Sequence, residues 1–324
     1  DGSLGDALGQ LYVQKFFPPA AKQRMIELVN NLQSTYAQRI KGLDWMSDST
    51  KPKALEKLNA FMKKIAYPDK WKDYSSIEID RSSIVNNLQH IGKWQYQYDL
   101  NKIGKVVDRT EWGMTPPTVN AYYNPSFNEI VFPAGILQPP FFFQDADDAV
   151  NYGAIGAVIG HEMTHGFDDQ GSQYDKDGNL KNWWTPEDKK KFEQKAQLVV
   201  DQYNNYVVLD SVHVNGKLTE GENIADVGGL AIAYAAFKNT AEGKSTEKIN
   251  GLTPDQRFFM SFAQIWRIKN TDARLLWRIN NDPHSPEMYR VDGPTSNMQA
   301  FYDAFGIKSG DKMYRPDSVR VHIW

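Results

Sequence analysis

The chain has 324 residues, of which 41% are hydrophobic and 24% are charged, and this composition permits a large buried core divided over two domains. A formal net charge of −3 gives no reason to expect nucleic acid as a partner, and no apolar run is long enough to predict a membrane span. Cysteine is absent, which excludes disulfides, thiolate ligands and a cysteine nucleophile, so a bound metal must be held by His, Asp or Glu.

The N-terminal part of the chain is predicted to be helical. Residues 18–41 have the apolar periodicity of an amphipathic helix, and a second helix is expected over residues 50–65. A domain edge is predicted at residues 68–76, where proline and polar residues interrupt the pattern, and a third helix is expected over residues 83–98. These helices carry no pattern that indicates chemistry, and His90 is interpreted as a structural residue.

A β-hairpin is predicted in the next segment. Residues 119–123 and 129–132 favour strands, and the turn signal Asn124-Pro125-Ser126 separates them. Residues 132–142 then form an apolar loop. This loop is either packed core or the wall of a hydrophobic pocket.

The motif H-E-x-x-H follows at His161, Glu162 and His165. Residues four apart on a helix share a face, so both imidazoles can bind one Zn²⁺ while Glu162 lies beside the metal as a general base. The alternative is a pair of solvated histidines flanking a surface glutamate. An apolar stripe over residues 150–159 and several glycines favour a buried helix, and therefore a metal site.

The segment after the motif contains several helix and turn signals. Gly166 is expected to end the motif helix in a left-handed conformation. Further helices are predicted to begin at Thr185 and at Thr253, each followed by proline and an acidic first turn, and another over residues 221–236. A hairpin with an Asn-Gly turn is predicted over residues 212–218.

Two histidines do not complete a catalytic zinc site, which has three protein ligands and one open position. Glu222 is the best candidate for the third ligand, and Asp226, one helical turn later, could hydrogen-bond a ligating imidazole. The alternative is that Glu222 only stabilises a helix N-terminus and Asp226 is a surface acid. Spacing alone leaves both interpretations open.

Four motifs, in this order, resemble the neprilysin family of zinc peptidases, which includes endothelin-converting enzymes and bacterial oligopeptidases. They are Asn120-Ala121-Tyr122-Tyr123, residues 131–142, residues 158–169 and residues 221–226. The similarity continues through residues 283–290 to the terminal Trp324. The resemblance implies a mainly α-helical fold with a small β-sheet (α+β), that is, a thermolysin-like catalytic domain of the zincin and gluzincin type.

The resemblance also implies the catalytic machinery. It assigns one zinc ion to the ligands His161, His165 and Glu222. Glu162 would be the general base, Asp226 would be a catalytic partner that supports the ligands from behind, and His284 would stabilise the oxyanion. Without the resemblance, His284 would be interpreted as a loop histidine.

Substrate-binding residues follow from the same resemblance. The backbone of a bound peptide would be held by Asn120, Ala121 and Arg290, the first two pairing with it as an added strand. The pocket for the residue after the cleaved bond would be lined by Val158, Ile136, Phe141 and Trp266.

These observations predict a zinc-dependent endopeptidase that cleaves oligopeptides on the amino side of hydrophobic residues, by Glu-assisted attack of a zinc-activated water. One alternative is a peptide-binding or inactive fragment that lacks the N-terminal lid half of the family, and another is an aminopeptidase. Residues 1–72 are interpreted as a remnant of that lid and residues 73–324 as the catalytic domain, with the missing N-terminal half as an expected partner. Vertebrate members of the family have cysteine where Val321 stands, which favours a bacterial periplasmic or cell-envelope protein, with the cytoplasm as the alternative.

Overall fold

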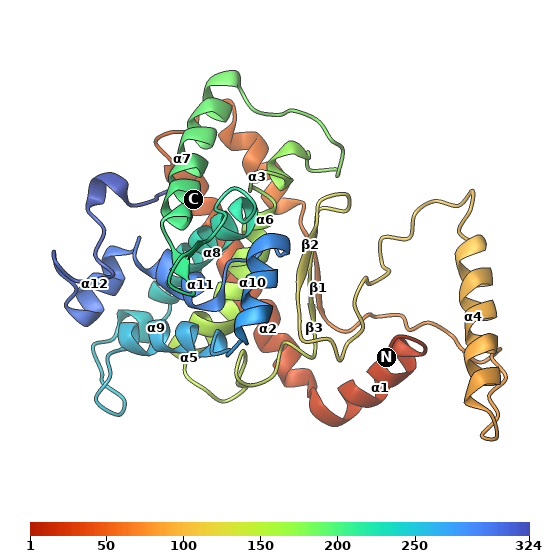
Figure 1. Ribbon diagram of the computed structural model, residues 1–324. Coiled ribbons are helices and arrows are strands. Elements are labelled where there is room, and N and C mark those ends of the chain that lie inside the picture. The colour runs from red at the N-terminus through yellow and green to blue at the C-terminus, as the bar shows by residue number, and fades with distance from the viewer.

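A computed structural model describes all 324 residues, from Asp1 to Trp324. Helices form most of the molecule, and Figure 1 shows a main body with one helix, α4, standing apart from it. No helix combines the length and the apolar character that crossing a membrane requires.

The structure contains twelve α-helices, numbered in chain order. They are α1 Gly5–Phe16, α2 Pro19–Gly42, α3 Lys51–Asn59, α4 Ile84–Leu100, α5 Asp148–Asn151, α6 Ala157–His165, α7 Pro186–Asn204, α8 Glu220–Lys238, α9 Pro254–Ile265, α10 Asp272–Asn281, α11 Glu287–Thr295 and α12 Gln299–Phe305. The predicted starts at Thr185 and Thr253 are confirmed, because each side chain accepts a hydrogen bond from the first turn of its helix. Thr253 also forms the full capping box with Gln256.

A three-stranded sheet in the order β1-β3-β2 lies beside these helices. Its strands are β1 Met62–Ala66, β2 Tyr122–Asn124 and β3 Glu129–Pro133. Strand β3 pairs in parallel with β1 and antiparallel with β2, so the predicted hairpin is confirmed and one edge of β2 is free.

The prediction of a helix through Ile65 was wrong over its last residues. Helix α3 ends at Asn59, and residues 62–66 form β1 instead. Lys64 of this strand forms a buried ion pair with Glu129 of β3, at 2.6 Å between Nζ and Oε2. The partner strand lies far along the chain, so local periodicity could not reveal it.

Two turn predictions were also wrong. Gly166 has φ −63° and ψ −15°, a right-handed conformation, because the chain continues turning after α6 towards Asp168. The hairpin β4 Val207–Val208 and β5 Val212–His213 turns at Leu209 and Asp210, and not at Asn215. The Asn215 side chain instead accepts hydrogen bonds from the backbone N–H groups of Lys217 and Leu218, which lead into α8.

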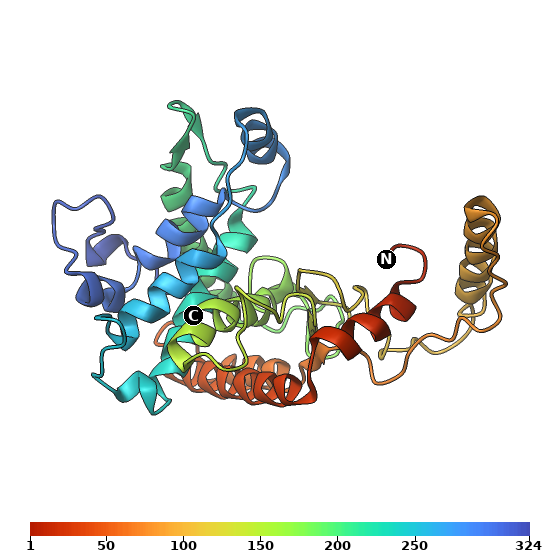
Figure 2. The same cartoon turned by 90° about the horizontal axis from the view of Figure 1, so that it is seen from below.

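The hydrophobic core is continuous from the N-terminal helices to the motif helix. Met25 and Leu32 of α2 are fully buried in the same cluster as Ile159 and Met163 of α6. Helix α4 differs, because it stands apart from the main body (Figures 1 and 2). Apolar side chains such as Ile84 are mostly exposed on it. Helices α2 and α3 share one core with the catalytic segment. The domain boundary at residue 72 stays a prediction.

Candidate metal centre

Helix α6 carries the H-E-x-x-H motif and lies directly against α8. A π-helical turn, Tyr152–Gly156, leads into α6, and Ile155, Ile159 and Met163 anchor it with fully buried side chains. At the crossing, a Cβ on Gly160 would lie 2.4 Å from the carbonyl oxygen of Gly229 in α8. The absence of side chains there lets the two helices approach closely, which brings the first turn of α8 opposite the histidines.

Three side chains from these helices point at one position. His161 Nε2 lies 3.0 Å from His165 Nε2. Glu222 Oε2 lies 3.2 Å from the former, and Glu222 Oε1 lies 3.6 Å from the latter. Donors bound to a tetrahedral zinc ion at 2.0–2.1 Å are about 3.3 Å apart, so this spacing fits the metal. Glu222 Oε2 is also buried without a hydrogen bond of ordinary geometry, as expected for a ligand atom.

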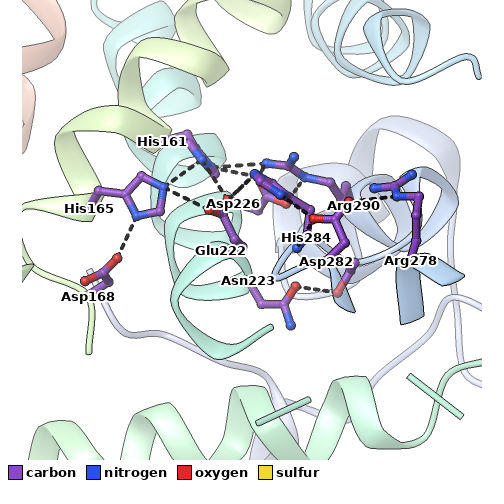
Figure 3. A network of polar contacts seen from close by, with 11 residues as sticks. His161, His165, Asp168, Glu222, Asn223, Asp226, Arg278, Asp282, His284 and Arg290 are labelled. Atoms are coloured by element: carbon purple, nitrogen blue, oxygen red, sulfur yellow. Dashed lines mark hydrogen bonds and ion pairs between the residues drawn. The ribbon is translucent and has the colours of Figure 1, made fainter. Parts of the chain in front are cut away.

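Carboxylates behind the histidines fix the orientation of both rings (Figure 3). His161 Nδ1 lies 2.8 Å from Asp226 Oδ1, and His165 Nδ1 lies 2.6 Å from Asp168 Oδ2. A carboxylate only accepts, so each Nδ1 donates, and a ring that is neutral then directs the lone pair of its Nε2 at the metal position. Two lone pairs facing each other repel unless a cation lies between them.

Asp168 was not predicted as part of the site, although Asp226 was. The signal that could have revealed Asp168 is its position three residues after His165, in the turn that ends α6. The sequence alone does not show that this turn folds back on the helix.

The acidic residues of the site have opposite pKa shifts. Burial raises the pKa of Glu162, against the opposing effect of the two neighbouring histidines. Burial would also raise the pKa of Glu222, but its contacts with His161 and His165 hold that pKa well below its usual value. The anionic form of Glu222 is therefore favoured, which suits a metal ligand, whereas Glu162 takes up a proton more readily than an ordinary glutamate.

His284 and Asp226 approach the same centre with their own partners. His284, in the loop between α10 and α11, has Nδ1 2.8 Å from Asp282 and Nε2 3.2 Å from Glu222 Oε2. Asp282 in turn accepts a hydrogen bond from Arg278 at 2.9 Å. Arg290 is buried and donates to both oxygens of Asp226, at 2.7 and 2.8 Å.

A cavity of about 590 Å³ opens over the metal position. All the substrate-binding residues expected from the resemblance line it, namely Asn120, Ala121, Ile136, Phe141, Val158, Trp266 and Arg290. Asn120 is exposed and lies just before β2, the strand with a free edge. The guanidinium of Arg290 lies 4.0 Å from the centre of the Trp266 ring.

Further lining residues were not predicted. They include Met114, Tyr122, Tyr123, Phe262, Ile265 and Ile268. The two tyrosines follow the predicted Asn120 and Ala121 in the chain, and Phe262 of α9 lies one turn before Trp266, the residue that caps this helix. The sequence predicted that these residues lie on a helix or a strand. It did not show which face of that helix or strand lines the cavity.

Two histidines four apart on a helix, joined by a glutamate from a second helix beside a small sheet, define the zincin class of fold. A sequence model of peptidase family M13 matches residues 120–321, and the model of the family's N-terminal region matches residues 1–68. The chain belongs to peptidase family M13. This finding confirms the predicted fold class and the resemblance to neprilysin and endothelin-converting enzymes.

Relatives occur among both animals and bacteria. An endothelin-converting enzyme homolog of Locusta migratoria is 42% identical and is matched over 96% of this chain and 44% of its own length. Human endothelin-converting enzyme 1 is 38% identical, over 99% of this chain and 43% of its own. The chain thus spans less than half the length of these curated relatives.

Two solved bacterial structures are also similar to this chain. The zinc metalloprotease ZMP1 of Mycobacterium tuberculosis, in complex with an inhibitor, superimposes with a TM-score of 0.93 at 49% identity, over all of this chain and 50% of that one. PEPO of Lactobacillus rhamnosis gives a TM-score of 0.90 at 35% identity, over 100% of this chain and 50% of that one.

Part of the family's N-terminal region is present in residues 1–68, so the prediction of a separate N-terminal partner gains no support. The bacterial origin and the periplasmic or cell-envelope location stay predictions.

Proposed function

We propose that this chain is the catalytic part of a zinc-dependent endopeptidase that cleaves oligopeptides on the amino side of hydrophobic residues. The observation that carries the proposal is the convergence of His161, His165 and Glu222 on one position, with Glu162 buried beside them. Membership of family M13 supports the same conclusion, as does the structural similarity to ZMP1, a zinc metalloprotease.

Each residue of the site has a distinct task in this mechanism. Zinc held by the three ligands supplies Lewis-acid chemistry that makes water easier to deprotonate. Glu162 accepts the proton of the attacking water and then gives it to the departing amine, a role that its raised pKa suits. His284, turned towards the centre by Asp282, stabilises the negative charge that develops on the carbonyl oxygen.

The substrate preference is inferred from the walls of the cavity. A peptide added to the free edge of β2 would run past Asn120 and Ala121, with main-chain hydrogen bonds holding it in register. The wall formed by Ile136, Phe141 and Val158 offers a hydrophobic side chain about 1.5–3 kcal/mol of burial free energy. Arg290 would hold the peptide backbone near the cleaved bond.

Two rival functions are less well supported. A peptide-binding or inactive fragment would have no need of Glu162, yet this carboxylate is present and 6% exposed next to the metal ligands. An aminopeptidase needs an acidic motif that binds the substrate amine, and none is visible upstream of α6 in the sequence.

Replacing Glu162 with Gln tests the proposal. We expect Glu162→Gln to keep its zinc and to lose about 10²–10⁴-fold in turnover of an internally quenched peptide, because only the general base is removed. Glu187→Gln, at an exposed position in the first turn of α7, is the matched control and should retain full activity. Unchanged turnover in Glu162→Gln would rule out the proposed base.

The same assay distinguishes the rival functions. A peptide blocked at its amino end should be cleaved before a hydrophobic residue. Cleavage that requires a free amino terminus would indicate an aminopeptidase, and binding without cleavage would indicate a peptide-binding protein.

A further inference from the structure

Lys57 of α3 is almost completely buried, with 1% of its surface exposed. It forms no ion pair within 4 Å, and instead its amine donates hydrogen bonds to two backbone carbonyls. These are the carbonyl of Gly171 at 2.6 Å and that of Tyr174 at 2.7 Å. Burying a lysine amine costs free energy unless the amine is hydrogen-bonded, and these two carbonyls supply the bonds.

The surroundings of the amine are aromatic. Nζ lies 5.6–5.9 Å from the ring centres of Tyr123, Phe167 and Trp183. Burial lowers the pKa of Lys57 to about 7, while the charges of Asp168 and Asp175 act in the opposite direction. The amine can donate to both carbonyls in either protonation state, so its hydrogen bonds persist through that pKa.

The carbonyls that Lys57 holds belong to the turn that positions Asp168. The N–H of Gly171 donates to Asp168 Oδ1 at 2.7 Å, and the other carboxylate oxygen accepts from His165 Nδ1 at 2.6 Å. The turn is folded tightly against the end of α6, since a Cβ on Gly171 would lie 1.8 Å from the carbonyl oxygen of His165. A continuous series of contacts therefore runs from Lys57 through Gly171 and Asp168 to a metal ligand.

We propose that Lys57 is a positioning residue for the metal centre: its amine fixes the turn over residues 168–174 and thereby the imidazole of His165. This inference rests on the proposed function, because it concerns the same zinc ion. Lys57 lies in the segment that matches the N-terminal family model, whereas Asp168 and His165 lie in the segment that matches the catalytic model. The N-terminal segment therefore supports the metal site through this turn, in addition to packing against the catalytic segment.

The test is zinc affinity in the whole chain. Lys57→Met preserves much of the packing volume but removes the amine, and we expect zinc affinity to fall about 10- to 100-fold in a chelator competition, the usual effect of losing support for a ligand. Lys53→Met, one turn earlier on α3 and exposed, is the matched control and should bind zinc as the wild type does. Lys57→Gln, which keeps amide donors, should have an intermediate affinity.

A second comparison separates positioning from general stability. Leu32→Ala in α2 removes a fully buried core side chain and should lower the melting temperature without weakening zinc binding by the folded protein. Lys57→Met with a lowered melting temperature but wild-type zinc affinity would overturn the inference alone. A wild-type chain that binds no zinc would overturn the proposed function and this inference together. If Lys57→Met does not fold, Lys57→Gln decides by the same affinity measurement.

Discussion

Each histidine of the candidate zinc site has two different contacts, one for each ring nitrogen. Nε2 faces the metal position, and Nδ1 donates to a carboxylate, Asp226 for His161 and Asp168 for His165. The negative charge behind each ring increases its basicity as a ligand. The network then extends to Arg290, which donates to both oxygens of Asp226, so the ligands have little freedom to turn.

At the residue scale, Lys57 should make the stability of the metal-free protein rise with pH. Burial lowers its pKa from 10.5 to about 7, so between these values the unfolded chain holds a proton that the folded chain has released. The free energy of unfolding therefore increases across this window, by at most about 1.4 kcal/mol per pH unit. Urea denaturation of the metal-free wild type and Lys57→Met, at several pH values in the window, measures the difference.

The variant and a control isolate this effect from other titrating groups. Lys57→Met should lack the increase, whereas the exposed Lys53→Met should show the same pH dependence as the wild type. Parallel stability curves for the wild type and Lys57→Met would show that the buried amine keeps an ordinary pKa.

The residues proposed to carry the chemistry were predictable, and so was Asp226, which supports His161, but the supporting residues Asp168 and Lys57 were not. His161, Glu162 and His165 were evident from their helical spacing, and Glu222 from the resemblance. Asp168 and Lys57 act through a turn that reverses the chain, and their contacts depend on three-dimensional folding that local sequence does not encode.

At the scale of elements, the metal site depends on the close crossing of α6 and α8. Gly160→Ala would place a methyl group 2.4 Å from the carbonyl oxygen of Gly229, so the helices must separate. We expect a loss of about 1–3 kcal/mol of stability and weaker zinc binding, because Glu222 moves away from the histidines. Urea denaturation and chelator competition measure the two effects.

Gly156→Ala is the matched control for that substitution. Its nearest neighbour to a new Cβ is 3.5 Å away, an ordinary contact, so stability and zinc affinity should change little. Equal behaviour of Gly156→Ala and Gly160→Ala would contradict the role assigned to the helix crossing.

Helix starts were predictable because their signals are local. The caps at Thr185 and Thr253 act within one turn, and both helices begin where expected. Strand β1 was missed because its pairing with β3 joins segments on either side of α4. The turn at Asn215 was misplaced because its side chain bonds to the backbone that follows it, which suits the approach to α8 as well as a hairpin.

At the scale of the whole molecule, both ends of the chain support the motif helix. The terminal Trp324 is 2% exposed, and its ring centre lies 6.2 Å from that of Tyr36 in α2 and 5.5 Å from that of Phe167 after α6. Arg39 of α2 also donates to the Trp324 carbonyl oxygen. The resemblance predicted this overall fold, but the sequence did not reveal that α4 stands apart from the main body (Figure 2).

Removing the terminal ring should therefore destabilise the whole molecule. We expect Trp324→Ala to lower the free energy of unfolding by about 3–5 kcal/mol, because it leaves a cavity between the N-terminal helices and the end of α6. His322→Ala, whose side chain is 64% exposed, should change it by less than about 0.5 kcal/mol. Similar unfolding midpoints for the two variants would contradict this view of the core.

The central claim is that His161, His165 and Glu222 hold a zinc ion, and metal analysis of the purified chain tests it most directly. After addition of zinc and dialysis, we predict about one zinc ion per folded chain. A folded chain that retains no zinc under these conditions would contradict the claim.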